Sequence, residues 1–154
     1  MSLNPLRCVV DASVGIQLFV GEPLSDRAHE LFAHLAADPP ARLYVPELFY
    51  IECANILWKY VRRFGYPPDQ ARRSVQQLSA LSLRSVPMAG LMGPALDLAL
   101  WQGITAYDAC YVALSRSLSI PFVTADEKLV QTVAGEAYDV HWLGDFPIPP
   151  VQRS

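Results

Sequence analysis

Four acidic side chains stand in apolar surroundings, in a chain of which only 18% of the residues are charged. They are Asp11, Glu52, Asp108 and Asp126. An ionised carboxylate in such surroundings is unfavourable unless a cation, strong hydrogen bonds or a metal ion compensates it, and few basic residues adjoin these acids. A hard divalent cation such as Mg²⁺ or Mn²⁺ prefers oxygen ligands and would account for all of them together. The hypothesis is one metal-binding site.

Each acid also has a structural interpretation. Asp11 and Asp126 could each cap a helix that follows it. Asp108 could be the acid of a capping box that Thr105 begins. Glu52 is different, because it lies about a turn and a half inside a predicted helix, where a cap has no partner, and a buried ion pair is its alternative. A single metal site shared by the four acids explains their apolar surroundings better than a separate structural role for each acid.

The elements that must position the acids alternate between short apolar strands and amphipathic helices. Strands are predicted at 7–10, 43–45, 84–86, 121–124 and 140–142. Helices are predicted at 25–37, 47–64, 69–81 with Asp69 as its cap, about 94–103, 107–118 and 127–135. Such alternation requires crossover connections, so we expect a three-layer α/β/α domain with a mostly parallel central sheet of four to five short strands. Ligands of such folds bind at the carboxyl ends of the strands, where Asp11 and Asp126 lie.

Length and composition limit the class of protein. The 154 residues are 52% apolar, which suits a single domain over 1–154 with a proline-rich, extended tail at about 146–154. No apolar run approaches the roughly 20 residues of a membrane span, and no secretory signal precedes the first strand, so a cytoplasmic protein is expected. Three cysteines and three histidines without metal-ligand spacing predict buried thiols and no zinc site.

Four segments carry a resemblance to a known family. They are 9–13, 46–57, 105–114 and 121–129, and they include the blocks Tyr-Asp-Ala-x-Tyr at 107–111 and Thr-Ala-Asp-x-x-Leu at 124–129. The chain resembles the PIN domain family, and within it the VapC-type toxins of type II toxin–antitoxin pairs. The match covers nearly the whole chain, although 65–103 carries no motif of its own.

The resemblance implies an endoribonuclease that depends on Mg²⁺ or Mn²⁺. Asp11, Asp108 and Asp126 would hold the metal, and Glu52 would complete the metal shell or accept the proton of the attacking water. Three further residues have secondary roles in this interpretation: Ser13, Asn55 and Thr124. The two hydroxyls could orient carboxylates or serve only capping and packing, and the amide could contact substrate or be a plain surface group.

The resemblance also implies partners. These are an RNA substrate, a small antitoxin protein that covers the acids, and a second copy of the chain joined through apolar helix faces. The net charge of −3 argues against a nucleic-acid partner, but without the four acids the charge becomes +1 (−3 + 4). Candidates for phosphate contacts, with solvated helix faces as the alternative, are Lys59, Arg62, Arg63, Arg72, Arg73, Arg116 and Lys128.

Other functions remain open at this level. A haloacid-dehalogenase-like phosphatase would use an aspartate at the first strand tip, but it requires a second aspartate where Ser13 stands. A signal-receiver-like domain would bind Mg²⁺ for regulation alone. A PIN-like domain without a toxin role could be an RNA-processing nuclease, or an inactive module that binds RNA or protein. Metal-dependent cleavage of RNA separates the enzymes from the binding modules.

Overall fold

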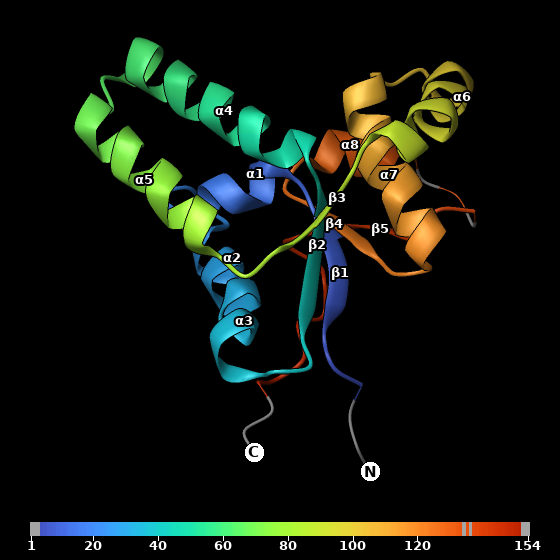
Figure 1. The fold of residues 1–154 in the computed structure, drawn as a ribbon, viewed down its shortest axis with the longest axis horizontal. Helices are drawn as coiled ribbons and strands as arrows, with labels where there is room; N and C mark the ends of the chain where they lie inside the picture. Colours follow the sequence, from blue (N-terminus) through green and yellow to red (C-terminus); the bar gives the residue numbers. More distant parts are fainter. Residues whose placement is uncertain (1–3, 134, 136, 152–154) are drawn as a thin grey trace.

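β1 (Arg7–Val10) is the central strand of a parallel sheet, as the computed structural model of residues 4–133, 135 and 137–151 shows (Figure 1). The other strands are β2 (Arg42–Pro46), β3 (Arg84–Val86), β4 (Phe122–Thr124) and β5 (Val140–Trp142). Their order is β3-β2-β1-β4-β5, and every pairing is parallel. The predicted parallel α/β sheet is confirmed, and β1 marks the point where the strand order changes direction, the usual place for a ligand.

Helices cover both faces of this sheet. One side carries α1 (Ala12–Gly15), α2 (Ser25–Phe32), α3 (His34–Ala37), α4 (Leu48–Phe64) and α5 (Pro68–Ala80). The other carries α6 (Met92–Gln102) and α7 (Ala106–Leu118), with α7 packed on β1 and β2. Short 3₁₀ turns at Ile16–Leu18 and Ala89–Leu91 precede α2 and α6, and α8 (Glu127–Thr132) follows β4.

Three sequence predictions about helices need correction. The helix predicted at 25–37 is two helices, with Ala33 between α2 and α3. The cap predicted at Asp69 was wrong, because Pro67 is the N-cap residue and Pro68 is the first residue of the helix. Proline suits this position, because a backbone N–H in the first turn of a helix would have no acceptor within the helix. Asp69 lies instead in the first turn and forms an ion pair with Arg72 at 2.7 Å. The helix predicted to reach 135 ends at 132, and residues 134 and 136 lie outside the described ones.

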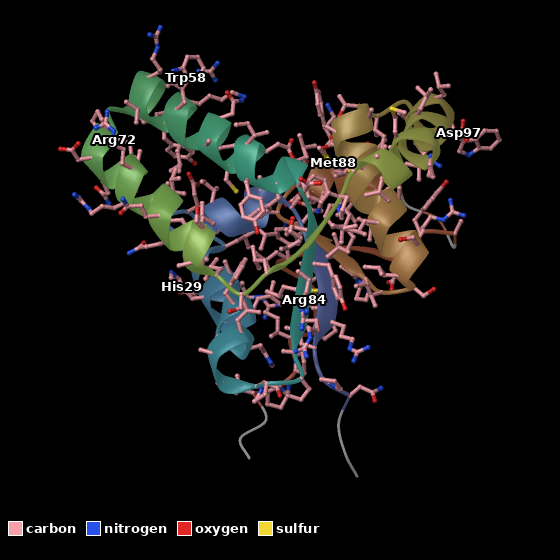
Figure 2. The ribbon with its side chains drawn as sticks, in the orientation of Figure 1. His29, Trp58, Arg72, Arg84, Met88 and Asp97 are labelled. Carbon is pink, nitrogen blue, oxygen red and sulfur yellow. The ribbon has the colours of Figure 1, made fainter. Side chains whose placement is uncertain are left out.

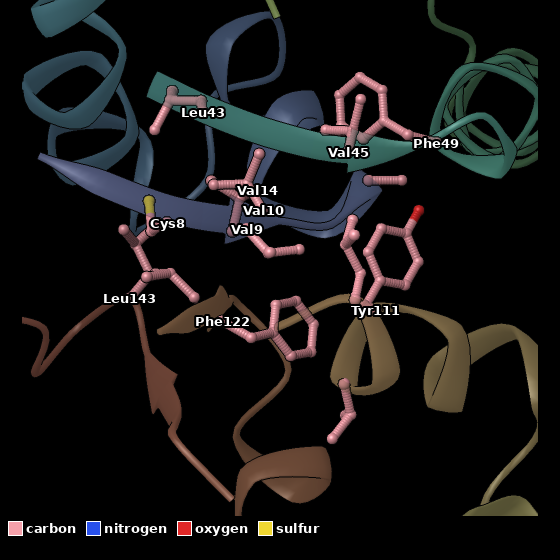
Figure 3. Close-up of a cluster of buried hydrophobic side chains, with 14 of the residues drawn as sticks. Cys8, Val9, Val10, Val14, Leu43, Val45, Phe49, Tyr111, Phe122 and Leu143 are labelled. Carbon is pink, nitrogen blue, oxygen red and sulfur yellow. The ribbon is translucent and has the colours of Figure 1, made fainter. Parts of the chain in front are cut away.

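A continuous apolar core joins the layers (Figure 3). Val9 and Val10 of β1 are fully buried, and the ring of Tyr111 on α7 stacks on Phe122 of β4 with centroids 5.6 Å apart. Cys8, Cys53 and Cys110 are buried free thiols, which confirms the expectation for cysteine. Because these side chains come from both sides of β1, the strand tip that carries Asp11 is held rigidly.

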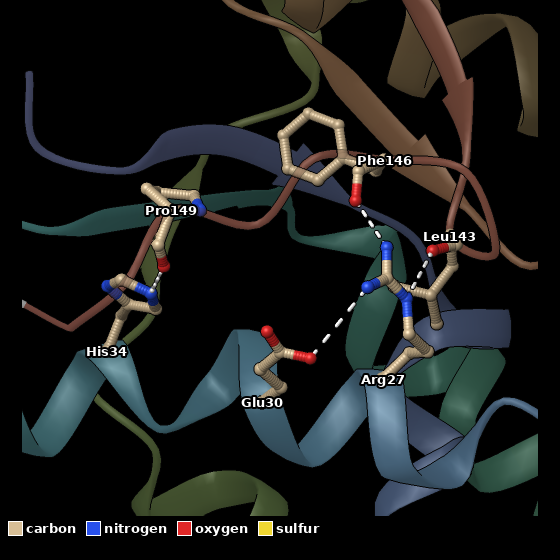
Figure 4. Close-up of polar contacts among 6 residues, drawn as sticks. All are labelled: Arg27, Glu30, His34, Leu143, Phe146 and Pro149. Atoms are coloured by element: carbon tan, nitrogen blue, oxygen red, sulfur yellow. Dashed lines mark hydrogen bonds and ion pairs between the residues drawn. The ribbon is translucent and has the colours of Figure 1, made fainter.

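The tail after β5 lies against α2 and α3 and is bound there by hydrogen bonds (Figure 4). Arg27 of α2 donates hydrogen bonds to the carbonyls of Leu143, at 3.2 Å, and Phe146. The Nε2 atom of buried His34 lies 2.8 Å from the carbonyl oxygen of Pro149. The predicted extended tail is therefore anchored up to this point, and its residues 152–154 lie outside the described ones.

No helix in the described part of the chain is long and apolar enough to span a bilayer.

Candidate active site

Asp11 lies at the carboxyl end of β1 and is 7% exposed. Its Oδ1 atom accepts hydrogen bonds from Ser13 Oγ at 2.5 Å and from the backbone N–H of Val14 at 3.2 Å, so the predicted cap of α1 is present. Thr124 Oγ1 donates to Oδ2 at 2.6 Å. Burial raises the pKa of Asp11 to about 6, although these hydrogen bonds oppose the rise. The hydrogen bonds thus fix the orientation of the carboxyl group, but they do not offset the cost of burying its negative charge.

Two hydroxyls connect Asp11 to the end of β4. Ser13 Oγ accepts a hydrogen bond from the backbone N–H of Ala125 at 3.0 Å, and Thr124 Oγ1 accepts one from that of Asp126 at 3.1 Å. The two hydroxyl oxygens are 3.3 Å apart. Each hydroxyl therefore contacts the Asp11 carboxylate and the backbone that carries Asp126, and the network fixes the distance between these two acidic segments.

Glu52 is a half-buried carboxylate on the second turn of α4. Tyr111 on α7 donates a hydrogen bond from its hydroxyl to Glu52 Oε1 at 2.5 Å. Figure 3 shows the Tyr111 ring in the core, with its hydroxyl turned toward the side of Phe49 at the start of α4. Burial raises the pKa of Glu52, and the hydrogen bond from Tyr111 partly opposes this. Among residues 4–133, 135 and 137–151, no basic side chain lies within 4.0 Å of Glu52, so the alternative of an ion pair is not observed.

Asp108 lies in the first turn of α7, and the predicted cap of this helix is confirmed. The Thr105 hydroxyl accepts a hydrogen bond from the backbone N–H of Asp108 at 3.1 Å. Partial burial, followed by the charge of Asp126, raises the pKa of the Asp108 carboxyl, and a side-chain hydrogen bond with Thr105 partly opposes this rise. Asp126 is exposed and caps α8, with its Oδ1 atom 3.1 Å from the backbone nitrogen of Leu129.

The four acids lie within range of one another's charge. The charge of Asp108 raises the pKa of both Asp11 and Glu52, while that of Asp126 raises the pKa of Asp108. Four segments distant in sequence therefore bring their carboxylates to one end of the sheet. Within the part of the chain that the structure describes, however, no three acidic, cysteine or histidine side chains are close enough to form a ready set of metal ligands.

The donor chemistry of this site fits a hard divalent cation. All four side chains offer carboxylate oxygens, and no Lys or Arg of the described residues pairs with them. The pKa values of Asp11, Glu52 and Asp108 are raised, first by burial and then by the charge of a neighbouring acid. A cation would cancel the repulsion and draw the carboxylates together. Asn55, also predicted here, is exposed on α4 one turn from Glu52.

Comparison with known proteins decides the family. The family model described as PIN domain matches residues 8–135, which include all four acids. The chain belongs to the PIN domain family. Over 130 residues it is 34% identical to "Ribonuclease VapC3" of Pyrobaculum aerophilum, covering 82% of this chain and 94% of that protein.

Solved structures support the fold of this PIN domain. The crystal structure of PAE2754 from Pyrobaculum aerophilum matches with a TM-score of 0.66 and 24% identity, covering 92% of this chain and 93% of the other. The structure of VapBC2 from Rickettsia felis, bound to a DNA fragment from its promoter, matches with a TM-score of 0.62 and 10% identity over 89% of this chain and 98% of that one.

Sequence reasoning did not assign Tyr111 to the site of this PIN domain. The available signal was its spacing: Tyr111 follows Asp108 by three positions on one helix, which places the two side chains on the same face. Its apolar neighbours are typical of a core position, and the ring is in the core while the hydroxyl reaches Glu52.

Proposed function

We propose that this PIN domain is a divalent-metal-dependent endoribonuclease that hydrolyses phosphodiester bonds in RNA. The observation that carries the proposal is the convergence of four acid-bearing segments at the carboxyl end of β1, where Asp108 lies within charge range of the other three acids. The similarity to a protein named as a ribonuclease supports it. A site built for one carboxylate nucleophile would not need the charge of three further acids beside it.

In this proposal Asp11, Asp108 and Asp126 hold Mg²⁺ or Mn²⁺. When bound, the ion lowers the pKa of a coordinated water and neutralises charge on the phosphodiester. Ser13 and Thr124 orient the Asp11 carboxylate through the hydrogen bonds described above.

Glu52 is the proposed general base. Its raised pKa moves it toward the range in which a carboxylate accepts a proton efficiently near neutral pH. The hydrogen bond from Tyr111 keeps one oxygen in place and leaves the other free to receive the proton. Asn55 contacts the substrate strand beside Glu52 on the surface of α4.

A cleavage assay with matched variants tests the activity. Purified protein with Mn²⁺ or Mg²⁺ should cut single-stranded RNA, and EDTA should stop it. Asp108→Asn should lower the rate by about 100-fold or more, because it removes an acid that couples to the other three. Asp97→Asn, an exposed acid on α6, is the control and should cut normally. No cleavage by the wild type with either ion, or full activity of Asp108→Asn, would overturn the proposal.

We also propose a toxin role, with a small antitoxin as the protein partner. Support comes from the fold shared with the VapBC2 structure. A partner of this kind would compensate the acids with a basic side chain. We expect this proposed action in the cytoplasm, where RNA and an antitoxin made in the same cell would both be present. Expression without the partner should arrest growth, and co-expression with the product of an adjoining short reading frame should restore it. Normal growth would leave an RNA-processing nuclease as the function.

Apolar side chains on α6 support the proposal of a homodimer. Met92, Leu96 and Leu100 recur every four residues along the helix and are 74%, 54% and 75% exposed, and neighbouring Trp101 is 81% exposed. A stripe of this kind is typical of a surface covered by another helix. Leu100→Glu should convert a dimer to a monomer in light scattering, and a wild-type monomer at high concentration would refute the proposal.

A further inference from the structure

The outer half of α4 carries a group of exposed side chains that the acidic site does not use. We propose that this group, here called the α4 track and consisting of Trp58, Lys59, Arg62 and Arg63, binds single-stranded RNA that extends from the acidic site. The inference rests on the proposed ribonuclease function and adds to it the surface that holds the substrate. Figure 2 shows Trp58 on α4, where this helix projects away from the sheet.

Helix geometry aligns the track with the site. Lys59 and Arg63 follow Glu52 by seven and eleven positions, which are nearly whole numbers of turns, so the three side chains share one face of α4. At 1.5 Å per residue, the two cations lie about 10 and about 16 Å along the axis from Glu52. A strand whose scissile phosphate is at the acids can therefore follow α4 outward and place its next phosphates against these cations.

The cations of the track are not occupied by protein carboxylates. Lys59, Arg62 and Arg63 are exposed, and within the described residues none of them lies within 4.0 Å of an acidic side chain. Arg72 on the adjacent helix α5 contrasts with them, because Asp69 pairs with it at 2.7 Å. Three unpaired cations on the helix that carries a site acid are suited to a polyanion.

Trp58 supplies an aromatic surface beside these charges. The residue is 57% exposed, and the guanidinium of Arg62 lies 5.6 Å from the centroid of its ring. Aromatic rings and guanidinium planes are the groups on which unstacked bases stack, and such stacking tolerates any sequence. An apolar partner helix would also bury an exposed indole, but the unpaired cations around it favour RNA over protein.

Binding measurements on two track variants test the inference. Each is made in the Asp108→Asn background, so that RNA is bound without being cut, and the probe is a fluorescent single strand of about 12 nucleotides, within the range of single-strand site sizes. Trp58→Ala should weaken binding by about 5- to 150-fold, the loss of one stacked base. Lys59→Ala with Arg63→Ala should reduce the slope of log K against log salt by about 1.4, the value for two phosphate contacts on a single strand.

The matched control removes the same charge elsewhere. Arg7 and Arg84 are exposed at the first positions of β1 and β3, at the opposite end of the sheet from the acids. Replacing both by Ala should leave the salt slope and the affinity near those of the parent. Circular dichroism and thermal unfolding of every variant establish that the fold is intact.

A cleavage series with a dinucleotide and the longer strand separates the two proposals. In the wild-type background the track variants should cut the dinucleotide at the normal rate and the longer RNA with a raised KM. Unchanged binding in the track variants, with cleavage by the wild type, overturns the inference and leaves the ribonuclease proposal standing. If the track variants weaken RNA binding but the wild type cuts no RNA, the inference about the track stands and the ribonuclease proposal is wrong. Normal RNA binding together with loss of a co-expressed protein partner would assign the track to protein, and the inference would be wrong.

Discussion

The buried charge of Asp11 predicts that the metal-free protein loses stability as pH rises. The pKa of this carboxyl is raised from 3.8 to about 6 on folding, because burial penalises the ionised form. The folded state therefore holds a proton that the unfolded chain has already released. The resulting stabilisation is fully present below the unfolded pKa and is lost as pH rises through the folded pKa. A shift of about 2 units corresponds to about 3 kcal/mol of unfolding free energy between about pH 4 and pH 7.

Asp11→Asn isolates this contribution. Asn cannot ionise, and its side chain can still accept from Ser13 and Val14 as the carboxylate does. Urea unfolding in EDTA should therefore show wild type losing up to about 3 kcal/mol more than the variant between about pH 4 and pH 7. Glu52 and Asp108, whose pKa values are also raised, should leave a smaller slope of the same sign in both proteins.

Addition of Mg²⁺ or Mn²⁺ at neutral pH should restore stability to the wild type and much less to Asp11→Asn, since a bound cation removes the cause of the penalty. Parallel pH curves for the two proteins in EDTA would show that the carboxylate of Asp11 is adequately solvated, and the electrostatic reasoning would be refuted.

Three other changes have defined outcomes. Tyr111→Phe removes the hydrogen bond that lowers the pKa of Glu52, so the acidic limb of the pH–rate profile should move to higher pH, and an unmoved limb would exclude this base. Gly15→Ala would place a Cβ 2.8 Å from Cζ of fully buried Phe49; the overpacking of about 1–3 kcal/mol should exceed the helix-propensity gain of about 1 kcal/mol, giving lower stability in urea. Arg27→Ala should expose the segment after β5 to limited proteolysis while RNA cleavage continues, and unchanged proteolysis would contradict the anchoring contact.

Local signals in the sequence were sufficient for most helix ends. Gly65 and Gly103 end α4 and α6 with φ of 67° and 69°, a conformation that glycine adopts without the steric penalty of a Cβ. Thr105 caps α7 as its spacing to Asp108 predicts. These features depend on neighbours within a few positions, so one sequence suffices to predict them.

Contacts between distant segments were beyond such signals. The hydrogen bond between Tyr111 and Glu52 joins residues 59 positions apart, and the one from Thr124 to Asp11 joins residues 113 apart. His34 is 1% exposed and bound to a tail carbonyl, a contact that no local pattern in the sequence indicated. Such pairings depend on the order of strands in the sheet, which the periodicity of single segments does not contain.

The central strand has a consequence for biosynthesis. β1 and β4 are neighbours in the sheet, but β4 is made long after β1, and β5 then follows and pairs with the outer edge of β4. A nascent chain on the ribosome therefore has Ser13 beside Asp11 but lacks Thr124, the second hydroxyl partner of this acid, until β4 has emerged. Because Asp126 lies just after β4, the acidic end of the sheet is completed only once that segment has left the ribosome.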